Sequence, residues 1–238
     1  MSSPSKPTLS VIVPVFNEHE FVEKSLRRLI STRLEHAPTR EIIVVDDGST
    51  DGSRELLRRL QTDLGFRLVE FPRNRGKGAA IRKGIEEAAG EFIGFHDADL
   101  EYDPADLDKM LLPLKQGKAD AVYGSRFAGG EERRLLFYWH QLGNRIITWL
   151  TNMVTNVNFS DIESCYKMFR ASDLKKIPLR SDRFSIEPEI TIKAAKQGLR
   201  FYEVSVSYNG RTYAQGKKIN WSDGLSAVYH IFRFAFFK

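Results

Sequence analysis

Cysteine is scarce in this chain, and long apolar runs are missing. Cys165 is the single cysteine among 238 residues, so no disulfide can form within the chain, which points to a reducing, intracellular compartment. The first eight residues, MSSPSKPT, are polar and lack the apolar core of a secretory signal. No uninterrupted apolar run reaches the ~18 residues that a spanning helix needs. We therefore expect a cytoplasmic chain that does not cross a membrane by itself.

Acidic residues are outnumbered by basic ones: 31 Asp and Glu stand against 36 Lys and Arg, a net charge of +5. The excess suggests an anionic partner, such as nucleotide phosphates, anionic lipid or nucleic acid, although a merely soluble basic surface explains it equally well. Hydrophobic residues make up 42% of the chain, enough for one substantial core. We expect a single domain over 1–238, with a flexible N-terminus at 1–8 and an amphipathic helix at 221–238.

Short β-branched runs alternate with helical patterns through the first half of the chain. The predicted strands cover 9–15, 41–45, 67–71, 92–96 and 119–125, and the predicted helices cover 18–34, 51–64, 77–89 and 104–116. A further helix at 187–197 and a strand at 200–206 follow. Strands separated by helices imply right-handed crossovers and a mostly parallel sheet covered on both faces. Ligands bind such sheets at the carboxyl ends of the strands.

Two acids leave the predicted strand 92–96 at alternate positions, Asp97 and Asp99. Alternate residues of an extended chain point to the same side, so both carboxylates can face one point. Like charges at one point repel each other unless a cation lies between them, and hard oxygen ligands suit Mg²⁺ or Mn²⁺. Capping acids at a strand end explain this spacing equally well. Nearby, Asp103 is interpreted as the N-cap of helix 104–116, and His96 as a packed strand residue rather than a ligand.

A second acidic pair, Asp46 and Asp47, ends the neighbouring predicted strand. Asp-Gly-Ser is ordinary turn and cap chemistry, but that does not explain a second pair of acids at a strand end. An acid there can bind ribose hydroxyls, as in other nucleotide-binding α/β folds. The motif PVFNE leaves the first strand in the same way and would place Phe16 and Glu18 beside the same crevice.

Basic loops rich in glycine follow other strands. RNRGKGAA supplies Lys77 and a helix N-terminus, both suited to anions. It matches a dinucleotide fingerprint only partly, because Ile81 occupies the third glycine position, so a dehydrogenase is disfavoured. GSRF brings Arg126 to the crevice rim. The late loop GRTYAQGKK contains Arg211, and such a loop can close over phosphates, although a solvated charged loop explains it as well.

Taken in order, these motifs resemble the inverting family-two glycosyltransferases of GT-A fold, and within them the dolichyl-phosphate mannose synthase type. The ordered set is PVFNE, VVDDGSTDGS, NRGKGAA, DADLE, YGSRF, SDIESCYKMFR and RTYAQGKKINWSDG, spanning residues 9 to about 224. Each motif alone is weak, but their order and their places at strand ends are specific. The Gln-x-x-Arg-Trp motif of processive cellulose- and chitin-type synthases is missing, which argues against polymerisation.

The resemblance implies an α/β fold with a mostly parallel, Rossmann-like sheet, helices on both faces and C-terminal amphipathic helices. It also implies metal-dependent transfer of a hexose, mannose or glucose, from a donor of GDP-mannose or UDP-glucose type. The implied acceptor is a polyprenyl phosphate, dolichyl or undecaprenyl, with inversion at the anomeric carbon. A phosphate acceptor is already a dianion near neutral pH and needs no strong base, whereas a hydroxyl acceptor would need one.

The resemblance also implies roles for individual residues. The nucleoside pocket would be lined by Pro14, Phe16, Glu18 and Asp47, next to Asp46, with Lys77 also on the donor. The metal on the diphosphate would be held by Asp97 and Asp99, with Glu101 joining them. Phosphate contacts would come from Arg126 and Arg145, and from Arg211, Lys217 and Lys218 in the late loop. Asp161 would lie near the transferred sugar, and would be the base if the acceptor were a hydroxyl. Asp99, Asp161, Arg126 and Arg211 form the expected catalytic set.

Two positions depart from the family pattern. Cys165 stands where relatives often carry glycine, which puts the local turn in doubt. Lys217 stands where relatives often carry serine. Two rival functions also remain open: transfer of sugar to a hydroxyl of a soluble glycan or protein, and a non-catalytic nucleic-acid-binding protein. The second is disfavoured, because a groove lined with acids repels phosphate backbones, and we expect no nucleic acid as a partner.

Two apolar stretches predict contact with a membrane surface. An apolar stripe at helical spacing runs through 146–157 with Arg145 at its start. The chain closes with an apolar run beside Arg233 and Lys238, made up of Trp221, Leu225, Val228, Tyr229, Phe232, Phe236 and Phe237. Aromatic and basic side chains together suit the headgroup boundary of a bilayer. The alternative is that both helices pack on the domain's own core or on a second subunit, and the oligomeric state stays open.

Overall fold

A computed structural model describes residues 7–130, 134–135, 137–211 and 221–236, apart from the side chains of 221–223 and 225. The strands are β1 (Leu9–Val15), β2 (Arg40–Asp46), β3 (Arg67–Glu70), β4 (Phe92–Phe95), β5 (Ala121–Ser125), β6 (Lys167–Arg170) and β7 (Phe201–Ser205). The helices are α1 (Val22–Ser31), α2 (Ser53–Leu64), α3 (Lys77–Glu87), α4 (Asp106–Lys115), α5 (Tyr138–Thr155), α6 (Ala171–Leu174), α7 (Ile186–Lys196) and α8 (Trp221–Phe236). The predicted flexible segment 1–8 falls largely outside the described residues.

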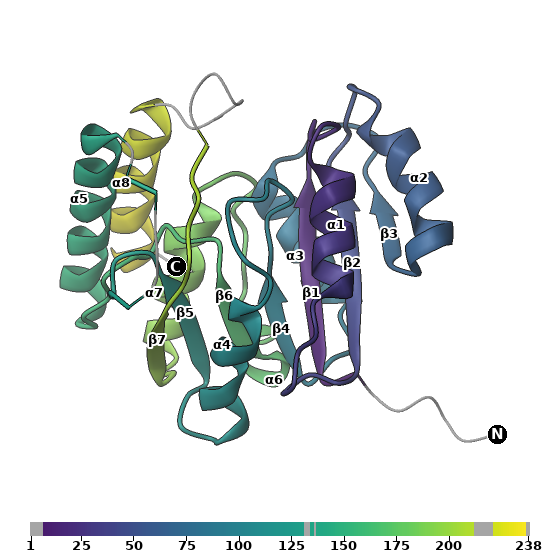
Figure 1. Cartoon of the computed structure of the whole chain (residues 1–238). Helices are drawn as coiled ribbons and strands as arrows, with labels where there is room; N and C mark the ends of the chain where they lie inside the picture. Colours follow the sequence, from purple (N-terminus) through teal and green to yellow (C-terminus); the bar gives the residue numbers. More distant parts are fainter. Residues whose placement is uncertain (1–6, 131–133, 136, 212–220, 237–238) are drawn as a thin grey trace.

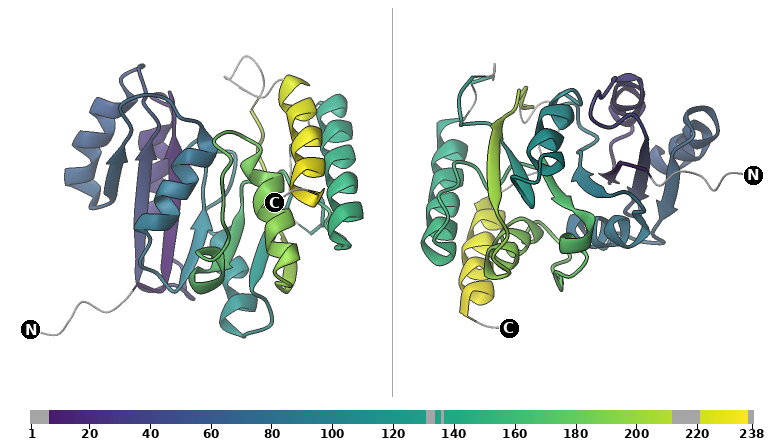
Figure 2. Two further views of the ribbon diagram at one scale, coloured as in Figure 1. Left: turned by 180° about the vertical axis from the view of Figure 1, so that it is seen from behind. Right: turned by 90° about the horizontal axis from the view of Figure 1, so that it is seen from below.

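The seven strands form one sheet in the order β3-β2-β1-β4-β6-β5-β7, with helices on both faces (Figure 1). Helices α1 and α4 cover one face and α3 covers the opposite face, as the rear view confirms (Figure 2). Strand β6 is antiparallel to its neighbours β4 and β5, and the other pairs are parallel. The prediction of a mostly parallel sheet is therefore confirmed. Buried residues of β1 and β2 form the middle of the core.

Strand β6 was missed by the sequence analysis. It contains only four residues, and Lys167 within it is fully buried, which breaks the apolar pattern that marks a buried strand. Its partners β4 and β5 lie about seventy and forty residues earlier in the chain, so no local turn signal announces the pairing. Only long-range pairing makes this segment a strand.

Three predicted helix starts, at 18, 51 and 104, were too early, since α1, α2 and α4 begin at Val22, Ser53 and Asp106. Residues 18–21 form a turn closed by Glu18, whose carbonyl oxygen accepts from the Phe21 and Val22 N–H groups, and α1 begins at Val22. Asp103 does not cap α4 directly, because its carboxylate accepts from the Ala105 N–H at 3.0 Å and its carbonyl from the Asp106 N–H. The chain therefore makes a turn first, and the helix begins at Asp106.

His96 is a packed residue, as predicted. It is buried directly after β4, where Nδ1 lies 2.7 Å from the Tyr166 hydroxyl and Nε2 lies 3.4 Å from Ser25 Oγ. Burial lowers the pKa of His96 to about 4, so its ring is neutral at physiological pH. Both ring nitrogens contact hydroxyl groups inside the core, so His96 supports the end of β4. The acids that follow it are the candidate ligand-binding residues.

Candidate functional site

The carboxyl ends of β1, β2, β4 and β5 lie along one edge of the sheet, and the polar motifs follow these ends. The loop after β1 is tied to the turn after β2, because Asn17 Oδ1 accepts the Thr50 N–H at 2.9 Å and Ser49 Oγ accepts the Asn17 N–H at 3.0 Å. Asn17 has a left-handed φ of 53°, which bends the chain out of β1 toward Glu18. Pro14 is half-buried within β1, and Phe16 is exposed just beyond it.

Asp46 and Asp47 are buried and bonded within the protein. Asp46 accepts from Arg54 Nε at 2.8 Å and from the Ser49 N–H at 3.2 Å. Asp47 accepts from the Arg75 and Gly76 N–H groups at 2.7 and 2.8 Å. Burial raises the pKa of Asp47, although these backbone hydrogen bonds oppose the rise. Both acids thus hold the loops that border the site, and a ribose contact from Asp47 would have to share one of these bonds.

A close backbone approach at Gly48 allows this arrangement. Gly48 has φ 74°, and a Cβ added there would lie 2.3 Å from the Arg73 carbonyl carbon. We expect Gly48→Ala to lower the free energy of unfolding by about 2–4 kcal/mol, from left-handed strain and overpacking together. Gly65→Ala is the matched control, because Gly65 has φ 72° with nothing within 4 Å, and should lose only about 1–2 kcal/mol. Equal losses in urea denaturation would contradict the close approach.

Four charged side chains form a chain of ion pairs that runs from the partly buried Lys77 and Asp97 to the buried Glu187 and Lys167. Lys77 Nζ lies 3.0 Å from Asp97 Oδ2 and 3.4 Å from Glu187 Oε1. Glu187 in turn pairs with the fully buried Lys167. Burial alone would lower the pKa of Lys77, but the charges of its acidic neighbours raise it well above the ordinary value. Lys77 is therefore a fixed cation beside Asp97.

The sequence analysis overlooked Lys167 and Glu187. Glu187 falls in α7 and resembles an ordinary first-turn helix acid, while Lys167 falls in the strand that was missed. Cys165, at the position where relatives often carry glycine, is buried. The available signals were Lys167 in SDIESCYKMFR and Glu187 in FSIEPEI. Neither motif indicates that these two side chains would form an ion pair.

A second cluster joins three acids to one arginine. Arg211 Nη1 lies 3.1 Å from Glu18 Oε2, and Arg211 Nη2 lies 3.2 Å from Asp99 Oδ2. Glu101 accepts the Arg211 N–H at 2.6 Å and the Tyr208 hydroxyl at 2.9 Å. Residues almost two hundred positions apart in the chain thus meet at one point.

The backbone between Asp99 and Glu101 is strained. Leu100 has a left-handed φ of 63°, a conformation that costs about 1–3 kcal/mol in a residue other than glycine and is concentrated at functional sites. Burial, with the charges of Glu101 and Asp97, raises the pKa of Asp99 to about 8. Negative charge is therefore in excess here even with Arg211 present, and an additional cation would be stabilised.

The acids fit a divalent cation as a pair rather than as a complete cage. Among the residues that the structure describes, no group of three His, Cys, Asp or Glu side chains is placed to hold a metal ion. Glu101 accepts from both the Arg211 N–H and the Tyr208 hydroxyl, whereas Asp97 and Asp99 each pair with one side-chain cation, Lys77 and Arg211 respectively. Magnesium and manganese commonly take one or two carboxylates and complete their shell with water and substrate phosphates. The oxygen donors and the excess negative charge both suit such an ion.

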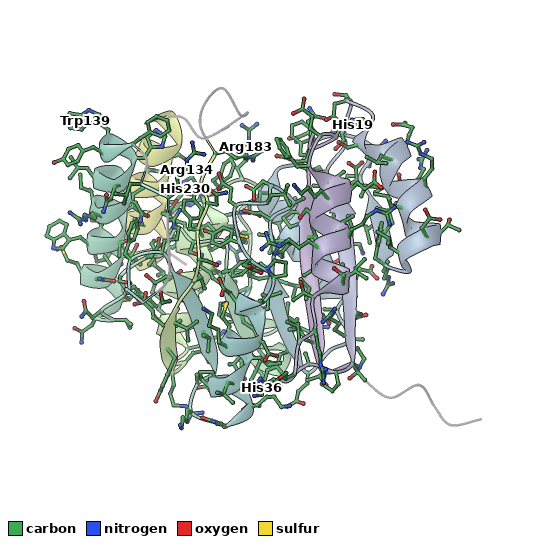
Figure 3. The ribbon with its side chains drawn as sticks, viewed as in Figure 1. His19, His36, Arg134, Trp139, Arg183 and His230 are labelled. Carbon is green, nitrogen blue, oxygen red and sulfur yellow. The ribbon has the colours of Figure 1, made fainter. Side chains whose placement is uncertain are left out.

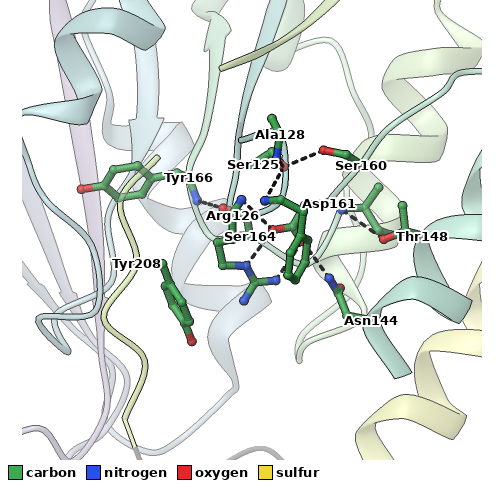
Figure 4. A network of polar contacts seen from close by, with 12 residues as sticks. Ser125, Arg126, Ala128, Asn144, Thr148, Ser160, Asp161, Ser164, Tyr166 and Tyr208 are labelled. Atoms are coloured by element: carbon green, nitrogen blue, oxygen red, sulfur yellow. Dashed lines mark hydrogen bonds and ion pairs between the residues drawn. The ribbon is translucent and has the colours of Figure 1, made fainter. Parts of the chain in front are cut away.

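Arg126 and Asp161 form a rigid pair at the end of β5 (Figure 4). Arg126 Nε lies 2.6 Å from Asp161 Oδ2, and its Nη2 lies 2.8 Å from Asp161 Oδ1. The Arg126 N–H and Asn144 Nδ2 also donate to the same carboxylate, both at 3.1 Å. Burial alone would raise the pKa of Asp161, but Arg126 holds it below its ordinary value. Asp161 is thus a poor proton acceptor and an anchor for the guanidinium, which also lies over the Tyr208 ring.

A pocket of about 430 Å³ opens beside these clusters. Its lining includes Glu101, Tyr208 and Arg134, so the acid cluster is reachable from solvent. Arg145, a predicted phosphate ligand, is exposed on α5, one residue after the Asn144 that contacts Asp161. Lys217 and Lys218 lie outside the described residues, and their predicted role stays a prediction.

Two of the relatives to which the chain is similar are named for polyprenyl phosphates. The chain is 29% identical over 211 residues to dodecaprenyl-phosphate galacturonate synthase of Rhizobium johnstonii. The aligned residues cover 88% of this chain and 61% of the relative. The chain is 28% identical over 211 residues to undecaprenyl-phosphate 4-deoxy-4-formamido-L-arabinose transferase of Edwardsiella ictaluri, covering 88% and 62%. The chain thus spans a little under two thirds of the length of these relatives.

A solved structure shares the fold. Glucosyl-3-phosphoglycerate synthase of Mycobacterium tuberculosis, in complex with Mn²⁺, uridine diphosphate and glucosyl-3-phosphoglycerate, superimposes with a TM-score of 0.74 at 18% identity, over 98% of this chain and 81% of that one. The predicted GT-A fold is thereby confirmed. The family model described as glycosyl transferase family 2 matches residues 10–178. Because this match covers well over half of the chain, the protein belongs to glycosyl transferase family 2.

Proposed function

We propose that the protein transfers a hexose, mannose or glucose, from a nucleotide-diphosphate sugar to a polyprenyl phosphate with inversion at the anomeric carbon. The relatives act, by their names, on dodecaprenyl and undecaprenyl phosphates. The observation that carries the proposal is that two charged clusters follow β4 and β5, whose carboxyl ends lie at one edge of the sheet. Asp97 and Asp99, with Lys77 and Arg211, form the donor pole, and Arg126 anchored by Asp161 forms the acceptor pole.

At the donor pole, Asp97 and Asp99 would hold Mg²⁺ or Mn²⁺ on the diphosphate of a GDP-mannose or UDP-glucose type of donor. A bound divalent ion would supply Lewis-acid stabilisation of the charge that grows on the leaving diphosphate. Lys77 keeps Asp97 in its ionised form, because the lysine is buried against it. Arg211 is the second cation of this pole and would face the same developing charge. The nucleoside would lie toward the loops after β1 and β2, near Phe16 and Glu18.

At the acceptor pole, Arg126 would bind the polyprenyl phosphate. A guanidinium binds a phosphate oxygen well when its orientation is preset, and Asp161 presets Arg126 through two side-chain bonds. A phosphate monoester has a second pKa near ~6, so the acceptor is a dianion near neutral pH and attacks without a general base. The fixed low pKa of Asp161 is compatible with this chemistry, because the residue need not take up a proton.

Transfer to a hydroxyl of a soluble glycan or protein is the alternative. That reaction needs a base at the acceptor pole, and the residue expected to serve, Asp161, is fully engaged by Arg126 and Asn144. A donor screen with Mn²⁺, a short polyprenyl phosphate and the matching polyprenol tests the choice. We expect product from one donor with the phosphate and none with the polyprenol. The proposal would be contradicted if product formed with the polyprenol but not with the polyprenyl phosphate, or if no product formed with either lipid.

A lipid acceptor requires contact with a membrane surface, and we propose that α5 and α8 provide it on the cytoplasmic face. The two helices pack side by side at the β5–β7 end of the molecule (Figures 1 and 2). The exposed apolar side chains on them are Tyr138, Trp139, Ile146, Trp149, Met153, Tyr229, Phe232 and Phe236. Trp139 projects from α5 away from the body of the molecule (Figure 3). No helix in the described parts of the chain is long and apolar enough to span a membrane.

Each helix divides its apolar residues between the core and the surface. Ala227, Ile231 and Phe234 of α8 are buried, whereas Tyr229 and Phe236 are exposed. Packing on the domain's own core therefore accounts for one face of α8 and leaves the other uncovered. Deletion of 231–238 would remove Ile231 and Phe234 from the core, so it is not a clean test of membrane binding. Trp221 and Leu225 have side chains outside the described residues, as have Phe237 and Lys238, so their predicted part in this surface stays a prediction.

Substitution of the exposed tryptophans tests the membrane proposal. We expect the double variant Trp139→Glu and Trp149→Glu to lower the liposome-bound fraction at least tenfold, because each buried aromatic contributes about 1.5–3 kcal/mol. Sedimentation with anionic vesicles measures the fraction, and binding of the nucleotide sugar should not change. Leu112→Glu is the matched control, because Leu112 is an exposed apolar residue on α4. Full sedimentation of the double variant, or an equal loss in the control, would exclude these helices as the membrane surface.

A further inference from the structure

Glu163 is a partly buried acid with one carboxylate oxygen that has no partner among the described residues. It lies in the irregular segment between α5 and β6, two residues after Asp161. Its Oε1 is buried, and no described residue forms a hydrogen bond with this atom. The neighbouring cations are already committed, Arg126 to Asp161 and Lys167 to Glu187. Buried carboxylate oxygens are nearly always hydrogen-bonded, so an orphaned one indicates a partner that arrives from outside the protein.

The position of Glu163 lies between the two poles. Two residues before it, Asp161 pairs with Arg126. Directly after it, the Ser164 carbonyl oxygen accepts from Lys167 Nζ, and Lys167 pairs with Glu187, which leads on to Lys77 and Asp97. Phosphates are expected at both poles, and the group that bridges a leaving diphosphate and an incoming phosphate is the transferred sugar. Glu163 is therefore beside the place where the sugar must lie.

The chemistry of Glu163 matches a sugar rather than a phosphate. A carboxylate accepts hydrogen bonds from hydroxyl groups, and it repels phosphates and other carboxylates. The neighbouring cations Arg126 and Lys167 are paired with other acids, and burial, followed by the charge of Glu187, raises the pKa of Glu163 to about 7. A neutral ligand rich in hydroxyl donors satisfies Oε1 without adding charge, whereas an anionic sugar would add to the repulsion.

We propose that Glu163 accepts hydrogen bonds from hydroxyl groups of the transferred sugar, and that it selects neutral hexoses over uronic acids. This inference rests on the proposed function, because it places the sugar between the two poles. A site built to bond a ligand hydroxyl discriminates strongly against ligands that leave its buried groups unpaired. The relative from Rhizobium johnstonii is named for galacturonate, an acidic sugar, and the relative from Edwardsiella ictaluri for a formamido-arabinose, a neutral sugar. Glu163 would place this chain among the enzymes that transfer neutral sugars.

Binding measurements with matched nucleotide sugars test the assignment. Calorimetry with Mn²⁺ would compare UDP-glucose with UDP-glucuronate and GDP-mannose with GDP-mannuronate, and would include UDP and GDP alone. For the base that binds, we expect the wild type to bind the neutral sugar nucleotide at least about tenfold more tightly than the uronate. Glu163→Gln should bring this ratio to within about threefold of unity, because the charge is lost, and should leave binding of the nucleoside diphosphate unchanged.

A neighbouring acid provides the matched control. Glu203 also lies beside Asp161, but its oxygens accept the Ser160 N–H at 2.9 and 3.1 Å, so Glu203→Gln should leave the ratio at its wild-type value. Glu163→Gln should also unfold at the same or a higher temperature, because it removes an unpaired buried charge. A purely structural role predicts a lower unfolding temperature with the ratio unchanged.

The outcomes separate this inference from the proposed function. If the wild type binds a nucleotide sugar and Glu163→Gln keeps the full discrimination, Glu163 is not a sugar ligand, while the proposed function stands. If the wild type prefers the uronate, the selection is opposite to the one proposed and the inference is wrong. If no nucleoside diphosphate or nucleotide sugar binds to the wild type, the proposed function fails and this inference fails with it.

Discussion

Asp99→Ala is expected to lower sugar transfer by about 10³-fold or more and to leave the protein folded. The carboxylate would be one of two protein ligands to the metal, and loss of a single group that stabilises developing charge costs about 10²–10³-fold even where no metal is lost with it. The free energy of unfolding should change little, because burial and neighbouring acids raise the pKa of Asp99 to about 8 and its charge is not stabilising in the fold. Transfer of radiolabelled sugar to a polyprenyl phosphate measures the loss.

Chelation should reproduce the effect reversibly. EDTA is expected to abolish transfer by the wild type, and Mn²⁺ or Mg²⁺ in excess should restore it. Asp103→Ala is the matched control, because Asp103 belongs to the same run of acids but pairs with Arg28 at 2.5 Å outside the proposed metal site. Binding of Mn²⁺ in the presence of nucleoside diphosphate, followed by electron paramagnetic resonance, gives a readout independent of turnover. Full activity in chelator, or unweakened Mn²⁺ binding by Asp99→Ala, would exclude the metal assignment.

Arg211→Ala is expected to lower kcat about 10²-fold while donor affinity falls by only a few-fold. The guanidinium faces Glu18, Asp99 and Glu101 at the donor pole, and charge on the leaving diphosphate appears only in the transition state. An interaction that strengthens in the transition state changes kcat, whereas uniform binding changes KM alone. Steady-state kinetics and direct titration of the nucleotide sugar separate the two.

A conservative variant distinguishes charge from geometry at this position. Arg211→Lys keeps the positive charge but cannot span the carboxylates of Glu18 and Asp99 with one planar group, so it should recover only part of the lost kcat. Arg200→Ala is the control, because Arg200 forms an exposed two-pronged pair with Asp120 away from the site. An unchanged kcat with weakened donor binding in Arg211→Ala would show that the residue binds the donor uniformly and does not stabilise the leaving group.

Much of the site could be anticipated because of a general property of parallel sheets. Strand ends that point the same way meet at one edge, so polar motifs that follow predicted strands converge there. That argument was sufficient to place Glu18, Asp99 and Arg126 at the same edge of the sheet. It was not sufficient to distinguish residues that can contact a ligand from residues that support the loops. Asp46 is bonded to Arg54, Asp47 to the Arg75 N–H and Asp161 to Arg126.

The amino-acid sequence by itself determined the alternation of strands and helices, the mostly parallel sheet and the edge at which the acids collect. These features depend on local periodicity and on the handedness of crossovers, which operate over short stretches of chain. Only the tertiary structure decided that β6 joins β4 to β5 antiparallel, and that Lys167 meets Glu187. It also decided that Glu163 Oε1 has no hydrogen-bond partner within the described parts of the chain, and which side chains of α8 remain exposed. Such features depend on contacts between residues far apart in the chain, where charge pairing and burial are properties of the packed whole.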